Sequence, residues 1–600
     1  AVKYSSSSQE HKITEHSNQA MAYRAMDDAT MRDNNPWLYT DPDIINSLPF
    51  SILPKGGFYN KTDYRMFSYD FRLSASWNKV FGNDNIINLY AGMEANAQNR
   101  SNNLFQGWGM QYDNGEIPYF DYNAFKKMRE DNSDYYSLSN TRRRTLAYFA
   151  TGTYSYQGRY SLTGTFRYEG SNRLGKARSA RWLPTWNIGF AWNMHEEKFF
   201  EKLQPTFSHF TLKSSYSLTA DAGPADVTNS FVNINSYTPW RPSASVGESG
   251  LHIVELENGD LTYEKKHEIN VGVDMGFFNN RMNIEFAWYK RNNYDLIGAV
   301  LTQGVGGETR RNANLASMKS HGYEVSLSTQ NIVTKNFQWS TDFIFGYSKT
   351  KITDLKSQTY LFDLVTGYGQ REGYDWGSIF SIPFAGLDED GFPTYLWNGE
   401  IIDKSNYGAI NFQQIQDIDF LKYEGPRDPT ITGSFGNIFT YKGLKLNVFI
   451  TYSAGNKVRL DPQFSSTYND LDATPKDFKN RWMLPGEEKI TNIPVIPSAR
   501  DNQKYSNLNY AYNAYNYSDV RIADGGFIRM KEISLTYDFP KSLLGSQNIL
   551  KTLSLKVQAT NLFLIYADDK LNGQDPEFFN SGGVAAPVPK QFTFTLRAGF

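Results

Sequence analysis

The residues of this chain that could do chemistry are few and scattered. Its 600 residues include no Cys, so disulfides, thiolate metal sites and Cys nucleophiles are excluded. The motifs H-E-x-x-H, G-x-x-x-x-G-K-[ST] and G-x-S-x-G are all absent from the sequence. No catalytic residue is predicted, and the histidines are interpreted as surface or turn groups. They are His11, His16, His195, His209, His252, His267 and His321.

The acidic run Asp388-Glu-Asp-Gly391 could suggest a calcium loop. An EF-hand needs further oxygen ligands and a Glu at its twelfth position. Here Phe392-Pro393 follows the run directly. We therefore interpret the run as a turn, and the sequence predicts no metal site and no cofactor.

Aromatic side chains gather in the segments that we expect to be long loops. Flat rings can stack on sugar faces, supply contact area to a protein partner, or fill the core of a folded loop. All three roles stay open at this point. The residues predicted to contact a substrate or a partner are Tyr237, Trp240, Tyr360, Phe362, Tyr368, Tyr374, Trp376, Tyr395 and Trp397.

Composition limits the kinds of protein that could position these residues. Lys and Arg number 61 against 63 Asp and Glu, so no basic excess points to nucleic acid. Aromatic residues make up 16% of the chain, yet it has no run of about 18 apolar residues, which a membrane-spanning helix requires. This combination fits strands with lipid on one face and water on the other. A soluble β-rich protein is the alternative.

Apolar and polar residues alternate with period two along the chain, which is typical of half-buried strands. Leu444, Leu446 and Val448, for example, alternate with Lys445 and Asn447. Segments of about ten residues or more are long enough for tilted membrane strands. We predict strands near 66–81, 86–98, 141–156, 159–169, 181–194, 206–218, 260–277, 282–293, 320–330, 337–349, 429–440, 444–453, 524–539, 552–562 and 591–600. Charged residues expected on their inward faces are Arg167, Glu169, Asp274, Glu285, Glu324 and Lys531.

The connections between these strands alternate in length, apart from a near tie on either side of 181–194. Short turns include Gln157-Gly158 and Asn279-Asn280, whereas the long loops include 219–259, 350–428 and 454–523. Short periplasmic turns alternate with long extracellular loops in outer-membrane barrels. A soluble sandwich has no reason to place its long loops at one end. The predicted fold class is therefore an all-β transmembrane antiparallel β-barrel that crosses the outer membrane many times.

The last strand of the chain ends in Phe. Phe592, Phe594, Leu596 and Phe600 share one face, and polar residues share the other. A final strand of this kind resembles the signal that is read by the barrel assembly machinery. The alternative is an ordinary amphipathic terminal strand.

Several sequence blocks resemble, in the same order, those of the SusC/RagA class of TonB-dependent outer-membrane transporters. Phe166-Arg-Tyr-Glu-Gly-Ser-Asn-Arg-Leu-Gly175, followed by Trp182-Leu-Pro-Thr-Trp186, is similar to the family's R-x-D-G-S-S-R-F-G…F-P-S segment. Glu169 replaces the usual Asp, and Thr185 the usual Ser. Similar blocks follow at Leu261-Thr-Tyr-Glu-Lys-Lys266, His321-Gly-Tyr-Glu324, Gly386-Leu-Asp-Glu-Asp-Gly391, Phe527-Ile-Arg-Met-Lys-Glu-Ile533, Asn561-Leu-Phe563 and Asp575-Pro-Glu577.

The resemblance covers about residues 50–600, and it implies more than the residue pattern does. It implies a barrel of about 22 strands, an N-terminal plug, a TonB-binding segment and a SusD/RagB-like surface lipoprotein over the mouth. The implied function is TonB-dependent active import of oligosaccharides or oligopeptides, with outer-membrane lipid around the barrel and no nucleic-acid partner. A passive porin and a surface receptor or adhesin barrel stay open as alternatives.

The strand count leads to expectations about domains. About 15 predicted strands is an odd number, whereas closed single-chain barrels normally have an even number. We expect residues 1–65 to form an extracellular loop and the possible end of a preceding strand, and 66–600 to form the C-terminal part of the barrel. No plug is readable in this sequence. Strand 66–81 should have an unpaired edge unless an earlier strand lies within 1–65, and 591–600 should lack its closing neighbour.

Overall fold

The structure is a computed structural model of the chain. It describes residues 1–600 apart from 27–31, 33–34, 36–37, 54, 83, 132–134, 174–180, 205, 224–231, 238–249, 257, 259–260, 305–309, 465–474, 545–549 and 580–585.

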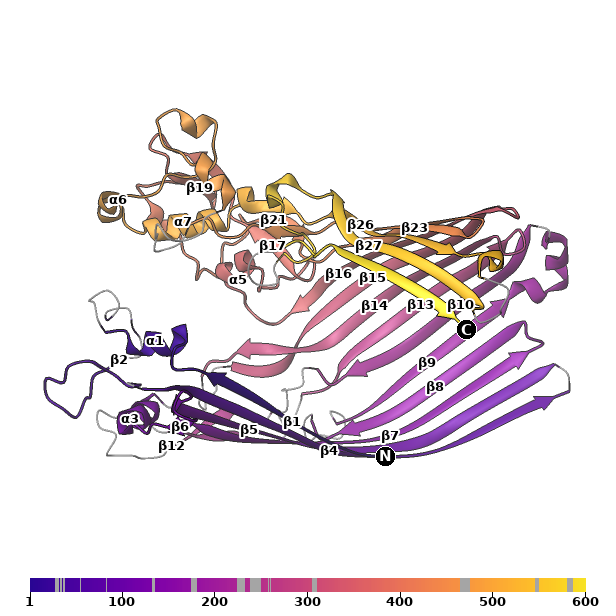
Figure 1. Ribbon diagram of the computed structural model, residues 1–600, viewed down its shortest axis with the longest axis horizontal. Helices are drawn as coiled ribbons and strands as arrows, with labels where there is room; N and C mark the ends of the chain where they lie inside the picture. The colour runs from indigo at the N-terminus through magenta and orange to yellow at the C-terminus, as the bar shows by residue number, and fades with distance from the viewer. Residues whose placement is uncertain are drawn as a thin grey trace.

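One antiparallel sheet dominates the molecule (Figure 1). Within the described residues it has seventeen strands, of which β6 (Ile117–Pro118) is a two-residue strand beside β5. Each of the other strands pairs with the next in this order: β1 (Val2–Ile13), β4 (Gly57–Phe81), β5 (Asn85–Gln111), β7 (Tyr136–Tyr156), β8 (Tyr160–Ser171), β9 (Trp182–Asn193), β10 (Phe207–Asp221), β13 (Glu264–Phe277), β14 (Met282–Leu301), β15 (Arg310–Val333), β16 (Phe337–Leu355), β22 (Ile431–Tyr441), β23 (Leu444–Ala454), β26 (Phe527–Asp538), β27 (Thr552–Tyr566) and β28 (Gln591–Gly599).

All fifteen predicted strands are present, and β1 is one more. Residues 2–13, which lie in the segment expected to be a loop with the end of a strand, pair with residues 58–69 of β4. The alternation pattern did not reveal β1 because its centre is the polar run Ser5–Ser8. β4 itself begins at Gly57 rather than near 66. Among the described strands no ladder joins β28 to β1 or β4, and these two edges lie apart in Figure 1.

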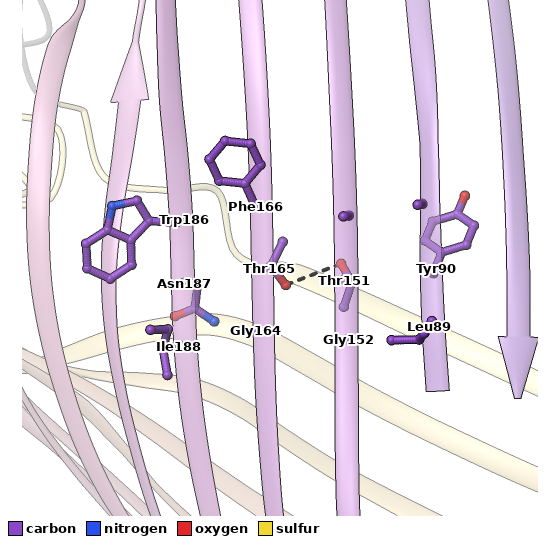
Figure 2. A pocket seen from close by; sticks show the side chains of 12 residues that line it. Leu89, Tyr90, Thr151, Gly152, Gly164, Thr165, Phe166, Trp186, Asn187 and Ile188 are labelled. Carbon is purple, nitrogen blue, oxygen red and sulfur yellow. Dashed lines mark hydrogen bonds between the residues drawn. The ribbon is translucent and has the colours of Figure 1, made fainter. Parts of the chain in front are cut away.

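The two faces of the sheet differ in polarity, as the alternation predicted. Thr151 and Thr165 lie opposite each other on the polar face, with 3.3 Å between their hydroxyl oxygens (Figure 2). The neighbouring residues Leu89, Phe166 and Ile188 belong to the apolar face and are exposed on it. They line a shallow hollow of about 510 Å³, whose centre is formed by small residues such as Gly152 and Gly164.

The polar face carries paired charges. Arg167 lies 2.9 Å from Glu94 and 2.6 Å from Glu169, so one cation links two carboxylates across three strands. Asp274 pairs with Lys213 on the adjacent strand. These paired charges lie on the polar face, which in a barrel of this type is the interior.

The connections fall into two groups at opposite ends of the strands. Tight turns such as Lys442-Gly443, both with positive φ, lie at the right in Figure 1. The long connections lie at the left and contain most of the other helices and short strands. No helix in the described parts of the chain is long and apolar enough to cross a membrane.

The remaining elements are short. The helices are α1 (Asn18–Arg24), α3 (Tyr122–Glu130), α5 (Leu361–Thr366), α6 (Ala499–Lys504), α7 (Leu508–Asn516), and the 3-10 helices η1 (Met194–Glu196), η2 (Lys198–Leu203), η3 (Tyr407–Ala409), η4 (Lys476–Asn480), η5 (Glu487–Lys489), η6 (Asp519–Arg521), η7 (Lys541–Leu543) and η8 (Asp569–Leu571). The strands are β2 (Leu38–Tyr39), β3 (Phe50–Ser51), β11 (Asn233–Tyr237), β12 (Gly250–Glu255), β17 (Ser378–Ser381), β18 (Phe384–Leu387), β19 (Pro393–Trp397), β20 (Glu400–Ile402), β21 (Lys422–Pro426), β24 (Lys457–Arg459) and β25 (Ile522–Asp524).

Candidate functional site

Two long connections, 356–430 and 455–526, fold together at the loop end of the barrel; we call them the loop module. Their shared core includes Phe380, Ile382 and Tyr515, which are almost fully buried. The buried phenol of Tyr395 donates a hydrogen bond of 2.6 Å to the Ala511 carbonyl. Burial raises the pKa of Tyr395 well above its ordinary value, so this hydroxyl stays protonated and keeps its role as donor. The loop module is therefore a packed unit.

Arg459 of β24 joins the two connections. Its guanidinium donates to the Phe380 carbonyl at 2.5 Å and to the Ser518 carbonyl at 3.4 Å. It also lies 5.6 Å from the centre of the Tyr517 ring. Burial lowers the pKa of Arg459 to about 10. Because Phe380 and Ser518 belong to different connections, these contacts hold the connections at a fixed distance.

The aromatic residues predicted to contact a substrate or partner have different surroundings. Tyr395 and Trp397 lie in the buried core, and Tyr374 packs against its edge. Three others are exposed at the loop end: Phe362, Tyr368 and Trp376, with exposed fractions of 37%, 83% and 44%. Tyr360 precedes α5 and is half-buried, and Tyr237 belongs to β11. Trp240 lies outside the described residues.

The acidic run 388–391 is a turn, as predicted. Asp388 accepts hydrogen bonds of 2.9 Å from the backbone N–H groups of Asp390 and Phe392. Lys404 lies 3.0 Å from Asp388 and also pairs with Asp390. Its ammonium group therefore satisfies the carboxylates that a bound cation would need.

One other group of side chains has the composition of a metal site. Glu15, His16 and Asp113 offer ligand atoms that lie within 4.8 Å of one another. The Glu15 carboxylate already accepts the backbone N–H groups of Tyr112 and Asp113, both at 3.1 Å. These hydrogen bonds connect the loop after β1 to the loop after β5. The role of the Glu15 carboxylate is therefore structural.

A cavity of about 610 Å³ opens where the loop ends of β22, β23 and β26 meet the connection 567–590. Two of its lining side chains are buried and carry polar atoms without a hydrogen-bond partner among the described residues, namely Ser453 Oγ and Asn456 Oδ1. The half-buried Lys531 also lines it, and the described residues give it no ion pair. Both oxygens are sealed from solvent, so a polar ligand in the cavity would contact the other polar lining groups, such as Lys531, Thr451 and Glu577.

A buried ion pair forms part of the cavity's support. Arg529 of β26 lies 2.5 Å from Asp575, and both side chains are almost fully buried. Arg529 also lies 3.3 Å from Glu577, which lines the cavity. Asp575 further accepts the backbone N–H of Glu577 at 3.1 Å. The Asp575-Pro-Glu577 block thus fixes residues 567–579 against the barrel wall.

Sequence reasoning did not find the cavity. Ser453 lies near the end of β23 and Asn456 follows the strand, whereas Glu577 is more than a hundred residues further along the chain. The sequence feature closest to the cavity is the Asp575-Pro-Glu577 block, which the sequence offers only as part of a family resemblance. The expected lumen residue Lys531 is the one earlier candidate that lines it.

Comparison with known proteins gives the family. The model described as "TonB dependent receptor-like, beta-barrel" matches residues 6–562. The chain belongs to this family. The prediction of a non-enzymatic outer-membrane barrel agrees with a receptor-barrel family.

Similar proteins cover most of this receptor barrel but are themselves longer. The TonB-dependent receptor P39 of Formosa agariphila is 26% identical over 564 residues, which are 86% of this chain and 51% of that protein. The TonB-dependent receptor SusC of Bacteroides thetaiotaomicron is 24% identical over 509 residues, which are 78% of this chain and 44% of that protein. The receptor barrel thus spans about half the length of the curated relatives it matches.

Solved structures show the same fold. The structure titled "Structure of the RagAB peptide transporter" superposes with a TM-score of 0.72 at 21% identity, covering 92% of this chain and 57% of that one. The RagAB peptide importer in its open-open state gives 0.73 at 21% identity, covering 92% and 56%. The SusC/RagA resemblance of the sequence blocks is therefore confirmed, and with it the large antiparallel barrel-type sheet.

Proposed function

We propose that this receptor barrel forms the wall of an energy-driven importer of large polar nutrients, either oligopeptides or oligosaccharides. The observation that carries the proposal is the loop-end cavity, whose lining includes the polar side chains of Lys531, Thr451 and Glu577. A ligand with several hydrogen-bonding groups would find donors and acceptors among these side chains. No covalent chemistry is required, only binding at the mouth followed by release inward.

Two partners belong to this proposal. A SusD/RagB-like surface lipoprotein would cover the mouth, where Phe362, Tyr368 and Trp376 are exposed on the loop module. Exposed aromatic rings on a rigid support are frequent anchors of protein interfaces. The TonB complex would supply the energy through a part of the protein other than the residues described here. The similarity to the RagAB peptide transporter favours a peptide over a sugar as the first substrate to test.

The final strand has a separate role in the proposal. Phe592, Phe594 and Leu596 share the apolar face of β28 and are strongly exposed on it, and Phe600 ends the chain beyond the strand. We assign these four side chains to recognition by the barrel assembly machinery. Replacing Phe600 by Asp should lower the amount of heat-modifiable barrel in the outer membrane. Equal amounts of folded barrel in the variant and the wild type would contradict this assignment.

Uptake of labelled oligopeptides and oligosaccharides by cells that express the full-length receptor tests the main proposal. Lys531→Gln should reduce uptake about tenfold, because it removes a charged contact from the lining of the cavity. Lys79→Gln is the matched control, since Lys79 is exposed near the turn end of β4. Uptake that persists after the energy source is removed would instead indicate a porin. Surface binding without uptake would indicate a receptor or adhesin.

A further inference from the structure

The outer face of β13–β16 carries an aromatic row about midway along these strands. Trp288 lies directly opposite Val271 on one side and Tyr323 on the other, and Tyr323 lies opposite Tyr347. The rings of Tyr323 and Tyr347 are stacked, with centroids 5.0 Å apart. Trp and Tyr are enriched where a membrane surface meets water. This row therefore marks the boundary between the apolar band and the headgroup region.

The next two rows of the same face are basic. They begin about 7 Å above the aromatic row, which is two residues along a strand. The first row contains Lys290, His321 and Lys349, which are directly opposite one another on β14, β15 and β16. In the second row Lys319 lies opposite Lys351. Like charges directly opposite each other in a sheet are destabilising, so an anion between them would relieve a real cost.

These cations have little compensation from the protein. Lys349 lies 3.6 Å from Asp375, a side chain that is almost fully buried. The described residues provide no ion pair for Lys290, Lys319 or Lys351, although all three are exposed. Asp375 also lies directly opposite Lys351 in an isolated β-bridge, but the ion pair of its carboxylate within the described residues is with Lys349. Three of the four lysines on this face thus have no ion pair within the described residues; we call Lys290, Lys319, Lys349 and Lys351 the basic band.

We propose that the basic band binds the phosphorylated headgroup of an outer-leaflet lipid. Its charge is complementary to phosphate, and ammonium groups on long stems can reach a headgroup from the edge of the apolar band. The aromatic row lies immediately below, so one molecule with an anionic head and an apolar tail would contact both surfaces. A soluble anion would use only the upper rows, and a protein partner would have to displace lipid from the rings.

This inference does not depend on import, because it concerns the lipid-facing surface and not the cavity. Its test uses the full-length receptor purified in detergent, with bis-phosphorylated lipid A as the probe and dephosphorylated lipid A as the second arm. The variant replaces Lys290, Lys319 and Lys351 by Gln. The matched control replaces Lys213, Lys445 and Lys556 by Gln, which removes the same charge from the inner face. Heat-modifiable migration establishes that each variant is folded.

The basic-band variant should bind bis-phosphorylated lipid A at least roughly tenfold more weakly than wild type does, since each Lys near a membrane surface contributes measurably to phosphate attraction. The control variant should bind as wild type does, and the difference should shrink at high salt. Unchanged binding by the basic-band variant would overturn the proposal. So would equal affinity of wild type for the two lipids, or binding of inorganic phosphate alone as tightly as the lipid.

Discussion

The barrel wall and the loop module both use many aromatic residues, but they use them in opposite ways. On the wall, Phe435, Phe594 and Tyr323 are exposed on the outer face of the sheet. In the loop module, Phe380 and Tyr395 are fully buried, and the Tyr395 hydroxyl has a backbone acceptor. The solvent explains the difference, since lipid accepts an exposed ring whereas water favours its burial. Residue type alone therefore does not tell whether an aromatic ring of this protein faces lipid or lies in the core of the loop module.

Breaking the buried pair between wall and loops should have the largest effect. Arg529→Met leaves the Asp575 carboxylate buried without its partner, which typically costs about 3–5 kcal/mol. The free energy of local opening in 567–590, measured by hydrogen exchange on the full-length receptor, should fall by that order. Glu577→Gln is the milder control, because Glu577 is partly exposed and lies further from Arg529. Equal protection of 567–590 in wild type and Arg529→Met would show that the pair does not hold this connection.

A matched pair of Phe substitutions tests the comparison directly. Phe380→Ala removes a fully buried ring that contacts Tyr374 and Tyr423, at centroid distances of 5.0 and 5.7 Å. It should destabilise the loop module by about 3 kcal/mol, measured as faster hydrogen exchange there. Phe435→Ala, on the exposed wall face, should change exchange by no more than about 0.5 kcal/mol. Similar effects of the two substitutions would contradict the proposed difference between wall and loops.

A single hydroxyl gives a smaller effect. Tyr395→Phe keeps the ring but removes the hydrogen bond to the Ala511 carbonyl, which should cost about 1 kcal/mol in local stability. Tyr368→Phe removes a hydroxyl from a ring that is 83% exposed, and it should leave exchange in the loop module unchanged. If Tyr395→Phe also left hydrogen exchange in the loop module unchanged, the buried hydroxyl would contribute nothing to the stability of the loop core.

The smallest predicted effect depends on pH. The hydrogen bond from Lys404 lowers the pKa of Asp390 below its ordinary value. The Lys404–Asp390 pair therefore stabilises the folded state above the pKa that Asp390 has in the unfolded chain, about 4. This stabilisation is lost as pH falls through the lower pKa of Asp390 in the folded state. Hydrogen exchange of the backbone around 388–404, relative to its intrinsic rate, should accelerate as pH falls from about 4 through the lower folded pKa of Asp390. Lys404→Gln should reduce this pH dependence, and an unchanged dependence would rule out the pair as its cause.

The strands of the fold could be predicted because their information is local. Alternation gave all fifteen predicted strands and the face of each residue, as with Leu444 and Lys445 on β23. It failed for β1, where Ser5–Ser8 are polar on both faces, and at the loop ends of β4 and β15, which continue where the alternation fades. Outside the apolar band, nothing forces a strand to alternate.

The candidate site could be predicted only in part. The loop aromatics were found by residue type, but type does not distinguish Tyr395, which is buried, from Tyr368, which is exposed. The cavity was not found, because Ser453, Asn456 and Glu577 meet only after two connections have folded against the wall. The polar groups that line the cavity are brought together by that packing and leave no trace in the spacing of the residues.

By itself, the sequence determined that this protein is a membrane barrel, which residues face lipid, and at which end the long loops lie. Period-two alternation and connection length carry that information, because each depends on neighbours within one strand or one turn. Only the tertiary structure decided which loop rings form a core, which polar groups surround the cavity, and that four lysines from three strands form one basic band. Those outcomes depend on the register between strands and on contacts between distant segments, which one-dimensional alternation does not specify.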